Sequence, residues 1–336
     1  MKKLIKYIII IGLIIGALIG LTLFTPTVNA PADGYLYIKS GATLSDVKKS
    51  LQEKQICNSI IFGTYARLFH YEQHIRSGKY AIDNHSTLFS LLRKLISGQQ
   101  TEVRLVINKL RTKEDFARLI SEKLEPSYTE ALTFLTSNDS LKSYSLDTNT
   151  VMTAVIPNSY LYWWNGSMRK IFERLKRQHD YFWERRNENT KAIGFSPEEV
   201  YTIASIVEEE TNRDADKGKV ASVYINRLHK GMKLEADPTV KYAMRDFELK
   251  RIMHIHLGFP SAYNTYQHTG LPPGPICTPS ITTIDAVLHA PKTDYLFFVA
   301  KPDFKGYSNF ASTYSEHLKY AAAYQKALDV LMQKSK

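Results

Sequence analysis

Residues 196–211 read SPEEVYTIASIVEEET, and this stretch decides how the C-terminal part of the chain folds. Ser196 is a good helix N-cap, Pro197 suits the first helical position, and Glu199 completes a capping box with the serine. The residues that follow alternate between apolar and polar with a helical period. The stretch therefore predicts an amphipathic helix with a sharply defined start.

Helical geometry separates the three glutamates at the end of this helix. With about 100° of rotation per residue, Glu210 falls within about 60° of Ile203 and Val207. Glu208 and Glu209 point away from this apolar stripe. A carboxyl group on a buried stripe loses hydration, which raises its pKa, and a raised pKa suits a general acid at neutral pH. The alternative is that Glu210 lies half exposed at the helix end and has no special chemistry.

The segments that follow predict more helices and little sheet. We expect helices over 216–230, 239–245 and 281–290, an extended stretch at 234–236, and a buried strand at 295–300. Asp237 and Pro238 are interpreted as the N-cap and first turn of the second of these helices. The Pro- and Gly-rich loop 270–275 is expected to be rigid because each proline locks its own φ angle.

A strand–turn–helix pattern recurs toward the N-terminus. Strands are expected at 35–38, 80–82 and 103–107, each followed five residues after its isoleucine by an N-cap threonine, at Thr43, Thr87 and Thr112. Such small units must pack together to bury their apolar faces. The pattern fits either a plain packing module or a small module that docks glycan or peptide, since one fold hosts many functions.

The chain divides into four predicted regions. A tip, anchor and tether occupy 1–30, the repeat module 31–110, a connecting helical region 111–160, and a larger mixed domain 161–336. The predicted fold class is α+β.

The first 30 residues predict a membrane anchor. Tyr7 to Phe24 is an uncharged apolar run of 18 residues, close to the roughly 20 that span a bilayer. Lys2, Lys3 and Lys6 precede it, so the positive-inside rule keeps the N-terminus in the cytoplasm and exports the remainder. The alternative is a cleaved signal peptide, for which residues 28–30 (VNA) resemble a cleavage site. We favour a retained anchor in the cell membrane.

Composition narrows the partners. The 44 Lys and Arg residues against 33 Asp and Glu give a net charge of +11, which fits an anionic partner. Export argues against nucleic acid as this partner and favours lipid headgroups or a wall polymer. The two cysteines, Cys57 and Cys277, exclude a disulfide scaffold, and whether they pair is left open.

Metal and cofactor chemistry have weak sequence support. His254 and His256 alternate, and His268, His289 and His317 follow, but no HExxH helix or cysteine cluster accompanies them. The default for these histidines is a solvent-facing or hydrogen-bonded side chain. No GxSxG elbow or phosphate-binding glycine loop is present. We expect no metal and no cofactor.

Three ordered blocks are similar to one known family. They are ASIVEEET (204–211), KVASVYINRLHKGMKLEADPTVKYA (219–243) and AYNTYQHTGLPPGPI (262–276). Together they resemble the endolytic murein transglycosylase family, also called MltG or YceG-like. The resemblance extends over nearly the whole chain, with the repeats matching a LysM-like region. It implies that the second Glu of the Glu-x-Glu-Thr run, Glu210, is the catalytic residue.

The resemblance also implies the reaction. The family cleaves the β-1,4 bond between N-acetylmuramic acid and N-acetylglucosamine in peptidoglycan without water, leaving 1,6-anhydromuramyl ends. Glu210 would act as a single acid and base, and Asn264, Tyr263 and Tyr266 are candidates to position the sugar. Asp237 is either a substrate contact or only a helix cap, and Glu235 either supports the site or faces solvent. The family suggests wall synthases and division proteins as further partners.

Two positions depart from the family pattern. Thr278 stands where Asn usually begins an Asn-Pro-Gly run, and Ser308 stands where His is frequent. Two other functions stay open at this point. One is a catalytically silent, membrane-anchored scaffold that binds peptidoglycan, and the other is a hydrolase that differs only in adding water.

Overall fold

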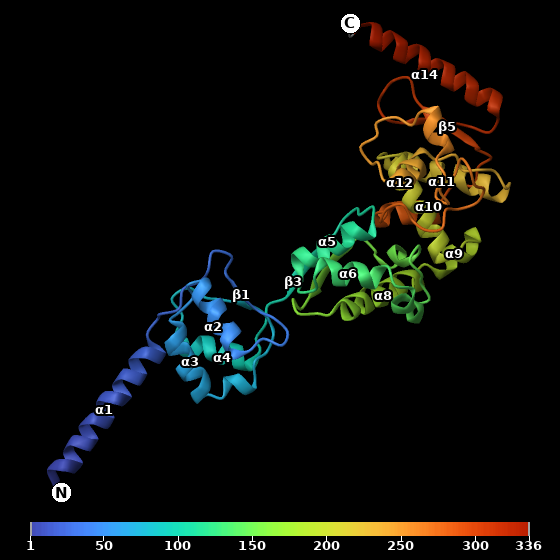
Figure 1. Cartoon of the computed structure of the whole chain (residues 1–336). Helices are drawn as coiled ribbons and strands as arrows, with labels where there is room; N and C mark the ends of the chain where they lie inside the picture. The colour runs from blue at the N-terminus through green and yellow to red at the C-terminus, as the bar shows by residue number, and fades with distance from the viewer. Residues whose placement is uncertain (1, 335–336) are drawn as a thin grey trace. The chain divides into compact units, whose positions relative to one another are not determined.

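The computed structural model describes residues 2–334 as a mixed α+β chain in two compact units (Figure 1). The first unit contains the chain up to Leu105 together with Ile120–Pro126 and Leu161–Ser167. The second contains Val106–Leu119, Ser127–Tyr160 and the chain from Met168 onward. This division differs from the four predicted regions, because 111–160 forms no unit of its own.

Two contacts explain why later segments join the first unit. Ser40 donates to the Glu125 carboxylate from its backbone N–H (2.6 Å) and from its hydroxyl (2.7 Å). The Trp164 ring packs edge-on against Tyr37, with centroids 5.1 Å apart. Both partners come from segments far apart in the sequence, which a division by consecutive residues does not capture.

The first unit begins with α1 (Lys2–Phe24), which extends from it as a single helix (Figure 1). Its other elements are β1 (Tyr35–Ile38), α2 (Leu44–Glu53), α3 (Ser59–Leu68), β2 (Gly78–Ala81) and α4 (Leu88–Ser97). Strands β1 and β2 pair antiparallel, with Tyr35 opposite Ala81. The predicted caps are confirmed, since the Thr43 and Thr87 hydroxyls accept from the amides of Asp46 (3.3 Å) and Ser90 (3.1 Å). The LysM-like assignment stays a prediction.

The middle of the chain is mostly helical. β3 (Val103–Ile107) pairs with β4 (Asn158–Tyr162) in a two-stranded sheet. The helices are α5 (Lys113–Lys123), α6 (Tyr128–Leu135), α7 (Asn138–Leu141), α8 (Met168–Glu184) and α9 (Asn187–Ile193). Short 3-10 helices lie at Tyr71–Gln73, Lys142–Tyr144, Val151–Ala154 and His254–Gly258. Thr112 accepts from the amide of Asp115 at 3.0 Å, which confirms the third predicted cap.

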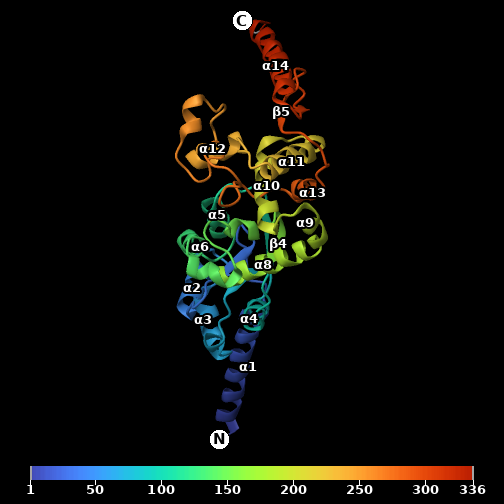
Figure 2. The ribbon, with the colours of Figure 1, turned by 90° about the vertical axis from the view of Figure 1, so that its right-hand side faces the viewer.

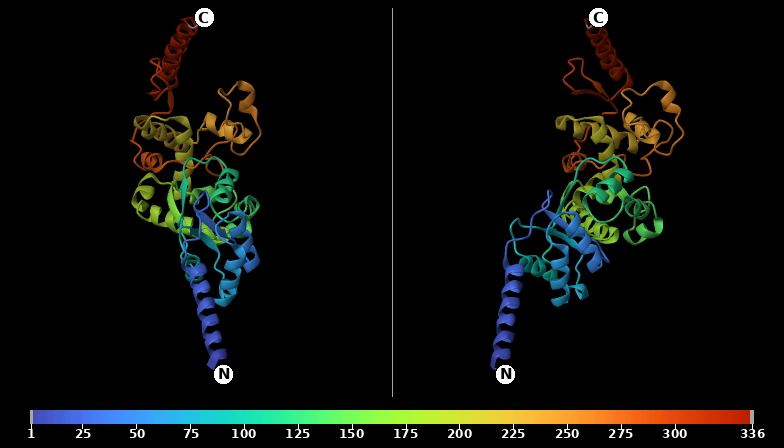
Figure 3. Two further views of the ribbon diagram at one scale, coloured as in Figure 1. Left: turned by 90° about the vertical axis from the view of Figure 1, so that its left-hand side faces the viewer. Right: turned by 60° about the vertical axis from the view of Figure 1, so that its left-hand side comes forward.

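The C-terminal half is organised around α10. Its elements are α10 (Pro197–Glu210), α11 (Asp214–His229), α12 (Asp237–Met244), α13 (Ile281–Leu288), β5 (Phe297–Ala300), β6 (Ser308–Ala311) and α14 (Tyr314–Lys334). Figure 2 shows α12 and the loop after it on one side of α10 and α11. In both panels of Figure 3, α14 extends beyond the β5–β6 ribbon.

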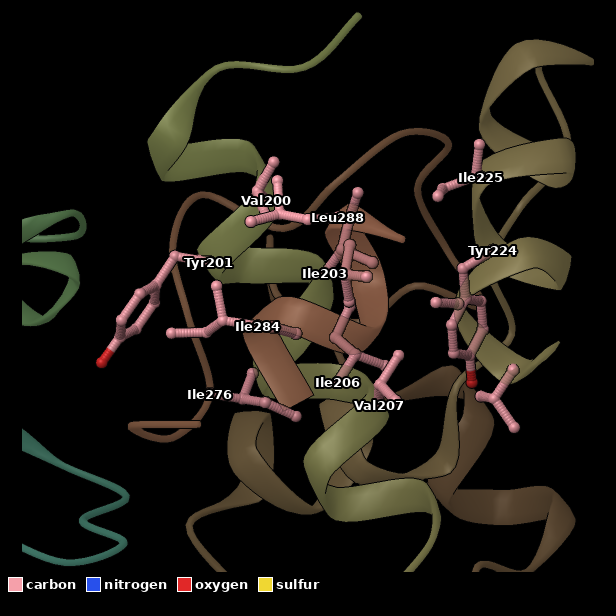
Figure 4. Packing of buried hydrophobic residues seen from close by; sticks show 14 of the residues in the cluster. Val200, Tyr201, Ile203, Ile206, Val207, Tyr224, Ile225, Ile276, Ile284 and Leu288 are labelled. Carbon is pink, nitrogen blue, oxygen red and sulfur yellow. The ribbon is translucent and has the colours of Figure 1, made fainter. Parts of the chain in front are cut away.

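The apolar stripe of α10 forms the core of this half. Val200, Ile203 and Ile206 are fully buried and pack against α11 and α13 (Figure 4). Burying one such side chain contributes roughly 1.5–3 kcal/mol. The Pro-Gly loop joins this core because the Ser205 hydroxyl accepts from the Ile276 amide at 3.0 Å. The capping box at Ser196 and Glu199 forms as predicted.

Three local predictions were wrong. Asp237 is not an N-cap, because α12 begins at Asp237, two residues before the expected start at 239, and Ala236 occupies the cap position. Glu235 is not extended, because its φ of 53° lies in the left-handed region. The strand predicted at 295–300 is not buried, because β5 pairs only with β6 and both strands stay partly exposed.

Candidate functional site

Glu208 is held inside the second unit by the start of α13. Its carboxylate accepts hydrogen bonds from the Ser280 hydroxyl (3.0 Å) and the Thr283 hydroxyl. The Lys217 ammonium lies 3.5 Å from the same carboxylate and is largely buried. This glutamate therefore ties α10 to α11 and α13.

Glu209 pairs with two cations from the segment before α5. Its carboxylate accepts from Nε and Nη2 of Arg111 at 3.2 Å each, and Nζ of Lys109 lies at 2.8 Å. Although burial raises its pKa, these hydrogen bonds and charges outweigh it, and the pKa of Glu209 is lowered. Glu209 thus stays ionised and structural.

Glu210 has a different environment from both neighbours. Its Oε1 accepts one hydrogen bond, from the Tyr224 hydroxyl of α11 at 2.8 Å. Burial raises the pKa of Glu210 to about 7, with Tyr224 and the charge of Lys241 offsetting part of that rise. The separation expected from the helical wheel is present, and this carboxyl group exchanges its proton near neutral pH.

Glu210 opens into a cavity of about 320 Å³, which we call the Glu210 cavity. Two further carboxylates, Glu235 and Asp237, line it. Most of the remaining wall is aromatic and consists of Tyr224, Tyr266, Phe297, Phe298 and Tyr314. Rings with polar edges beside a few fixed polar groups are suited to binding a sugar.

Arg227 fixes one wall of this cavity. Its side chain is 9% exposed and donates to the carbonyl oxygens of Leu296 (2.7 Å) and Leu234 (3.1 Å). It also donates to the Glu235 carboxylate at 2.9 Å. Because Glu235 adopts a left-handed backbone, this ion pair helps to hold a conformation that non-glycine residues seldom adopt. Arg227 therefore holds the half-exposed Glu235 side chain in this wall.

Asp237 and Tyr266 form a second fixed pair. The Tyr266 hydroxyl donates to Oδ1 of Asp237 at 2.7 Å. This contact gives the Asp237 carboxylate a partner other than the helix N-terminus that the sequence predicted. It connects the start of α12 to the loop that carries Tyr266, and both residues line the Glu210 cavity.

Asn264 and Tyr263 do not line the Glu210 cavity. Asn264 is fully buried, and its amide donates to the carbonyls of Leu257 (3.0 Å) and Phe259 (2.8 Å), while its Oδ1 accepts from the Tyr266 amide. Asn264 was expected to position the sugar, and in this structure its amide atoms are engaged inside the loop. Tyr263 lines a separate pocket described below.

Sequence reasoning missed Tyr224, Arg227 and His317. Tyr224 falls inside the helix expected over 216–230, and nothing local marks its hydroxyl as the partner of Glu210. His317 lines the Glu210 cavity and stacks on Phe297, with ring centroids 5.3 Å apart. Its buried Nδ1 has no hydrogen-bond partner among the described residues. Burial and the charge of Arg227 lower its pKa, which favours neutral imidazole.

The two departures from the family pattern lie at structural positions. The Thr278 hydroxyl accepts from the Leu110 amide (2.8 Å) and donates to the Asn108 carbonyl (3.0 Å). The Ser308 amide donates to the Asp216 carboxylate at 2.7 Å. Both cysteines are free thiols. Within residues 2–334, no three His, Cys, Asp or Glu side chains gather closely enough to hold a metal ion.

The sequence that forms this fold matches one known family. The model of the YceG-like family matches residues 36–323, which is most of the chain. The chain belongs to this family. The match includes the whole Glu210 cavity.

Individual proteins are similar to this chain over most of its length. An endolytic murein transglycosylase of Bacillus subtilis is 29% identical over 311 residues, covering 85% of this chain and 83% of its own length. The Streptococcus pneumoniae protein of that name is 24% identical over 300 residues, and the matched part is 53% of its length. The crystal structure of a yceG-like protein from Listeria monocytogenes superposes with a TM-score of 0.57 at 25% identity, covering 86% of this chain and 99% of that one.

Proposed function

We propose that this chain is a membrane-anchored lytic transglycosylase that cuts inside peptidoglycan glycan strands at the bond between N-acetylmuramic acid and N-acetylglucosamine. The observation that carries the proposal is Glu210, a carboxyl group with a pKa of about 7 in a cavity walled by aromatic rings. The names of the relatives support the substrate class.

Glu210 serves both steps of the proposed reaction. The protonated carboxyl gives its proton to the glycosidic oxygen as the bond to the muramyl anomeric carbon breaks. The carboxylate then takes the proton of the muramyl 6-hydroxyl, whose oxygen closes onto that carbon. A 1,6-anhydro end and a free 4-hydroxyl result, and no water is consumed. Ordinary glycosidases need a second carboxylate as nucleophile or base, a role that the substrate hydroxyl fills here.

The surrounding residues position the acid and the sugar. Tyr224 orients Glu210 and partly stabilises its ionised form, which lets one group both donate and accept a proton. Tyr266, held by Asp237, offers a ring to a sugar face. Glu235 is held by Arg227 and keeps the wall in shape. We assign no substrate contact to Asn264, and the chemistry requires no cofactor.

The helix α1 supports the anchoring part of the proposal. Leu4–Phe24 is long and apolar enough to cross a membrane and is exposed along most of its length. With the lysines before it on the cytoplasmic side, the catalytic unit would face the wall. We propose that strands made close to the membrane are the substrate, with wall synthases and division proteins as neighbours.

The test is a digestion of purified peptidoglycan by the full chain in detergent, compared with Glu210→Gln, with fragments analysed by mass spectrometry. We expect internal fragments with anhydromuramyl ends from the wild type alone. New reducing ends would instead establish a hydrolase.

Wall binding without cleavage by either protein would favour the scaffold. Circular dichroism and urea unfolding of both proteins establish that the comparison is between folded molecules.

A further inference from the structure

A second cavity lies at the opposite end of α12 from the Glu210 cavity. It has a volume of about 230 Å³ and is lined in part by Tyr242, Arg245 and Tyr263; we call it the Arg245 pocket. Asp237, the first residue of α12, lines the Glu210 cavity instead. Since α12 has eight residues, its length is about 12 Å. One short helix therefore has a cavity at each end.

The Arg245 pocket presents positive charge. Lys113 and Arg245 line it, and no carboxylate is among its described lining residues. Nζ of Lys113 donates to the Thr148 carbonyl at 2.7 Å, which satisfies one of its three protons. Two carboxylates lie near these cations without lining the pocket. Glu114 pairs with Arg245 at 4.0 Å, the outer limit of an ion pair, and Asp147 accepts three hydrogen bonds from the turn that follows it.

Burial gives this charge more effect than it would have on an open surface. Burial lowers the pKa of Lys113, and the neighbouring Glu114 raises it only in part. An anion that entered the pocket would replace water around Lys113 and gain from a weakly screened attraction. The Arg245 side chain is 47% exposed, and its guanidinium lies 4.7 Å from the centre of the Tyr242 ring. Its one ion pair, with Glu114 at 4.0 Å, leaves donors of the planar fork for a further carboxylate.

The rest of the lining suits a peptide. Met152, Ala243 and Pro275 supply apolar surface, and Asn149 supplies an amide. A ligand with small aliphatic groups, peptide bonds and free carboxylates complements this combination. In peptidoglycan, the stem peptide on each muramyl residue has that composition.

Gly274 shapes the wall of the pocket. A Cβ at this position would lie 2.1 Å from the Asn149 carbonyl oxygen and 3.3 Å from the Tyr263 hydroxyl. Only glycine lets the Pro-Gly loop close against Asn149. Tyr263 lines the Arg245 pocket and Tyr266 lines the Glu210 cavity, so the 263–266 segment contributes to both.

We propose that the Arg245 pocket binds a carboxylate of the stem peptide while the glycan lies in the Glu210 cavity. This inference rests on the proposed function and adds a recognition site to it. An extended stem of five residues reaches about 17 Å, which exceeds the roughly 12 Å along α12. The enzyme would then select strands that still carry their peptides.

The test compares two soluble, uncrosslinked glycans, one with intact stems and one stripped by an amidase. We expect the full chain in detergent to have a higher kcat/KM for the glycan with stems. Arg245→Gln should reduce that preference by about tenfold, mainly through KM, since it removes a charge-assisted contact. Arg245→Lys should retain part of it. Lys250→Gln removes one exposed charge outside the pocket and should leave the preference unchanged.

A binding measurement keeps this proposal separate from catalysis. Isolated stem peptide, with free or amidated carboxylates, is titrated into the wild type, Lys113→Gln and Arg245→Gln by NMR. We expect the free peptide to bind the wild type at least tenfold more tightly than the amidated peptide does. Each variant should bind the free peptide at least tenfold more weakly than the wild type does. Urea unfolding shows whether each variant is folded.

The outcomes distinguish the two proposals. If the wild type cuts neither glycan, the proposed function fails and the titration alone decides the pocket. If the wild type cuts both glycans equally well, or binds free and amidated peptide equally, the stem-binding inference is overturned while the reaction stands.

Discussion

Replacing Tyr224 with Phe tests whether the proton of Glu210 controls the reaction. The phenol donates to Oε1 of Glu210 at 2.8 Å and stabilises its ionised form. Burial and the nearby carboxylate hold the pKa of Tyr224 well above its ordinary value, so it stays a donor throughout the accessible pH range. Phe keeps the ring and removes only the hydroxyl. The pKa of Glu210 should therefore rise further.

The size of the change follows from this one hydrogen bond. A hydrogen bond to a charged group contributes about 1.5–3 kcal/mol, and 1.36 kcal/mol corresponds to one pH unit. Starting from a pKa of about 7 for Glu210, the basic limb of activity should move upward by about one to two pH units. The basic limb moves to higher pH because Glu210 must be protonated in order to donate its proton to the glycosidic oxygen.

The assay is the pH dependence of kcat/KM for release of anhydromuramyl fragments from a soluble glycan, which reports the free enzyme. Tyr201→Phe is the matched control, because it also removes one buried tyrosine hydroxyl, bonded to the Val155 carbonyl at 2.6 Å and outside the cavity. Tyr201→Phe should lower stability and leave the limb in place. A limb that stays or moves downward in Tyr224→Phe would refute the assignment of Glu210 as the acid.

Two further predictions concern stability. The pKa of Glu210 is about 7 against an ordinary 4.5, so the folded state keeps a proton that the unfolded state has lost, and stability falls as pH rises between these values. Glu210→Gln should remove this pH dependence, so that its free energy of unfolding exceeds that of the wild type by up to about 3 kcal/mol at pH 8. Urea unfolding would contradict this if the free energies of unfolding of the two proteins changed equally between pH 5 and 8. Arg227→Met should lower stability by about 1–3 kcal/mol, because it leaves the carbonyl oxygens of Leu296 and Leu234 without their donor. An unchanged urea midpoint would exclude that role.

The sequence determined the features that depend on neighbouring residues. The capping box at Ser196 and the threonine caps formed as predicted, because the amide that each hydroxyl accepts from lies three positions further along the chain. The helical period alone separated Glu210 from Glu208 and Glu209. The three blocks of sequence also indicated the family that the comparison found.

Sequence predictions were wrong or incomplete where a side chain had a distant partner. Asp237 looked like a cap because an acid before a proline commonly is one, yet its carboxylate meets a hydroxyl 29 positions away. Nothing in the sequence indicated that the Asn264 amide donates to two carbonyls of its own loop. The left-handed backbone of Glu235, paired with Arg227, had no local signal because its residue type seldom adopts it.

The sequence by itself therefore determined the helix that carries the acid and the face on which the acid lies. Only the tertiary structure decided what surrounds it: Tyr224 on Glu210, Arg227 on Glu235, Tyr266 on Asp237, and the Arg245 pocket at the far end of α12. The physical reason is range. Helix caps and periodicity arise from residues within a turn or two, whereas the solvation of a carboxyl group depends on every element packed around it.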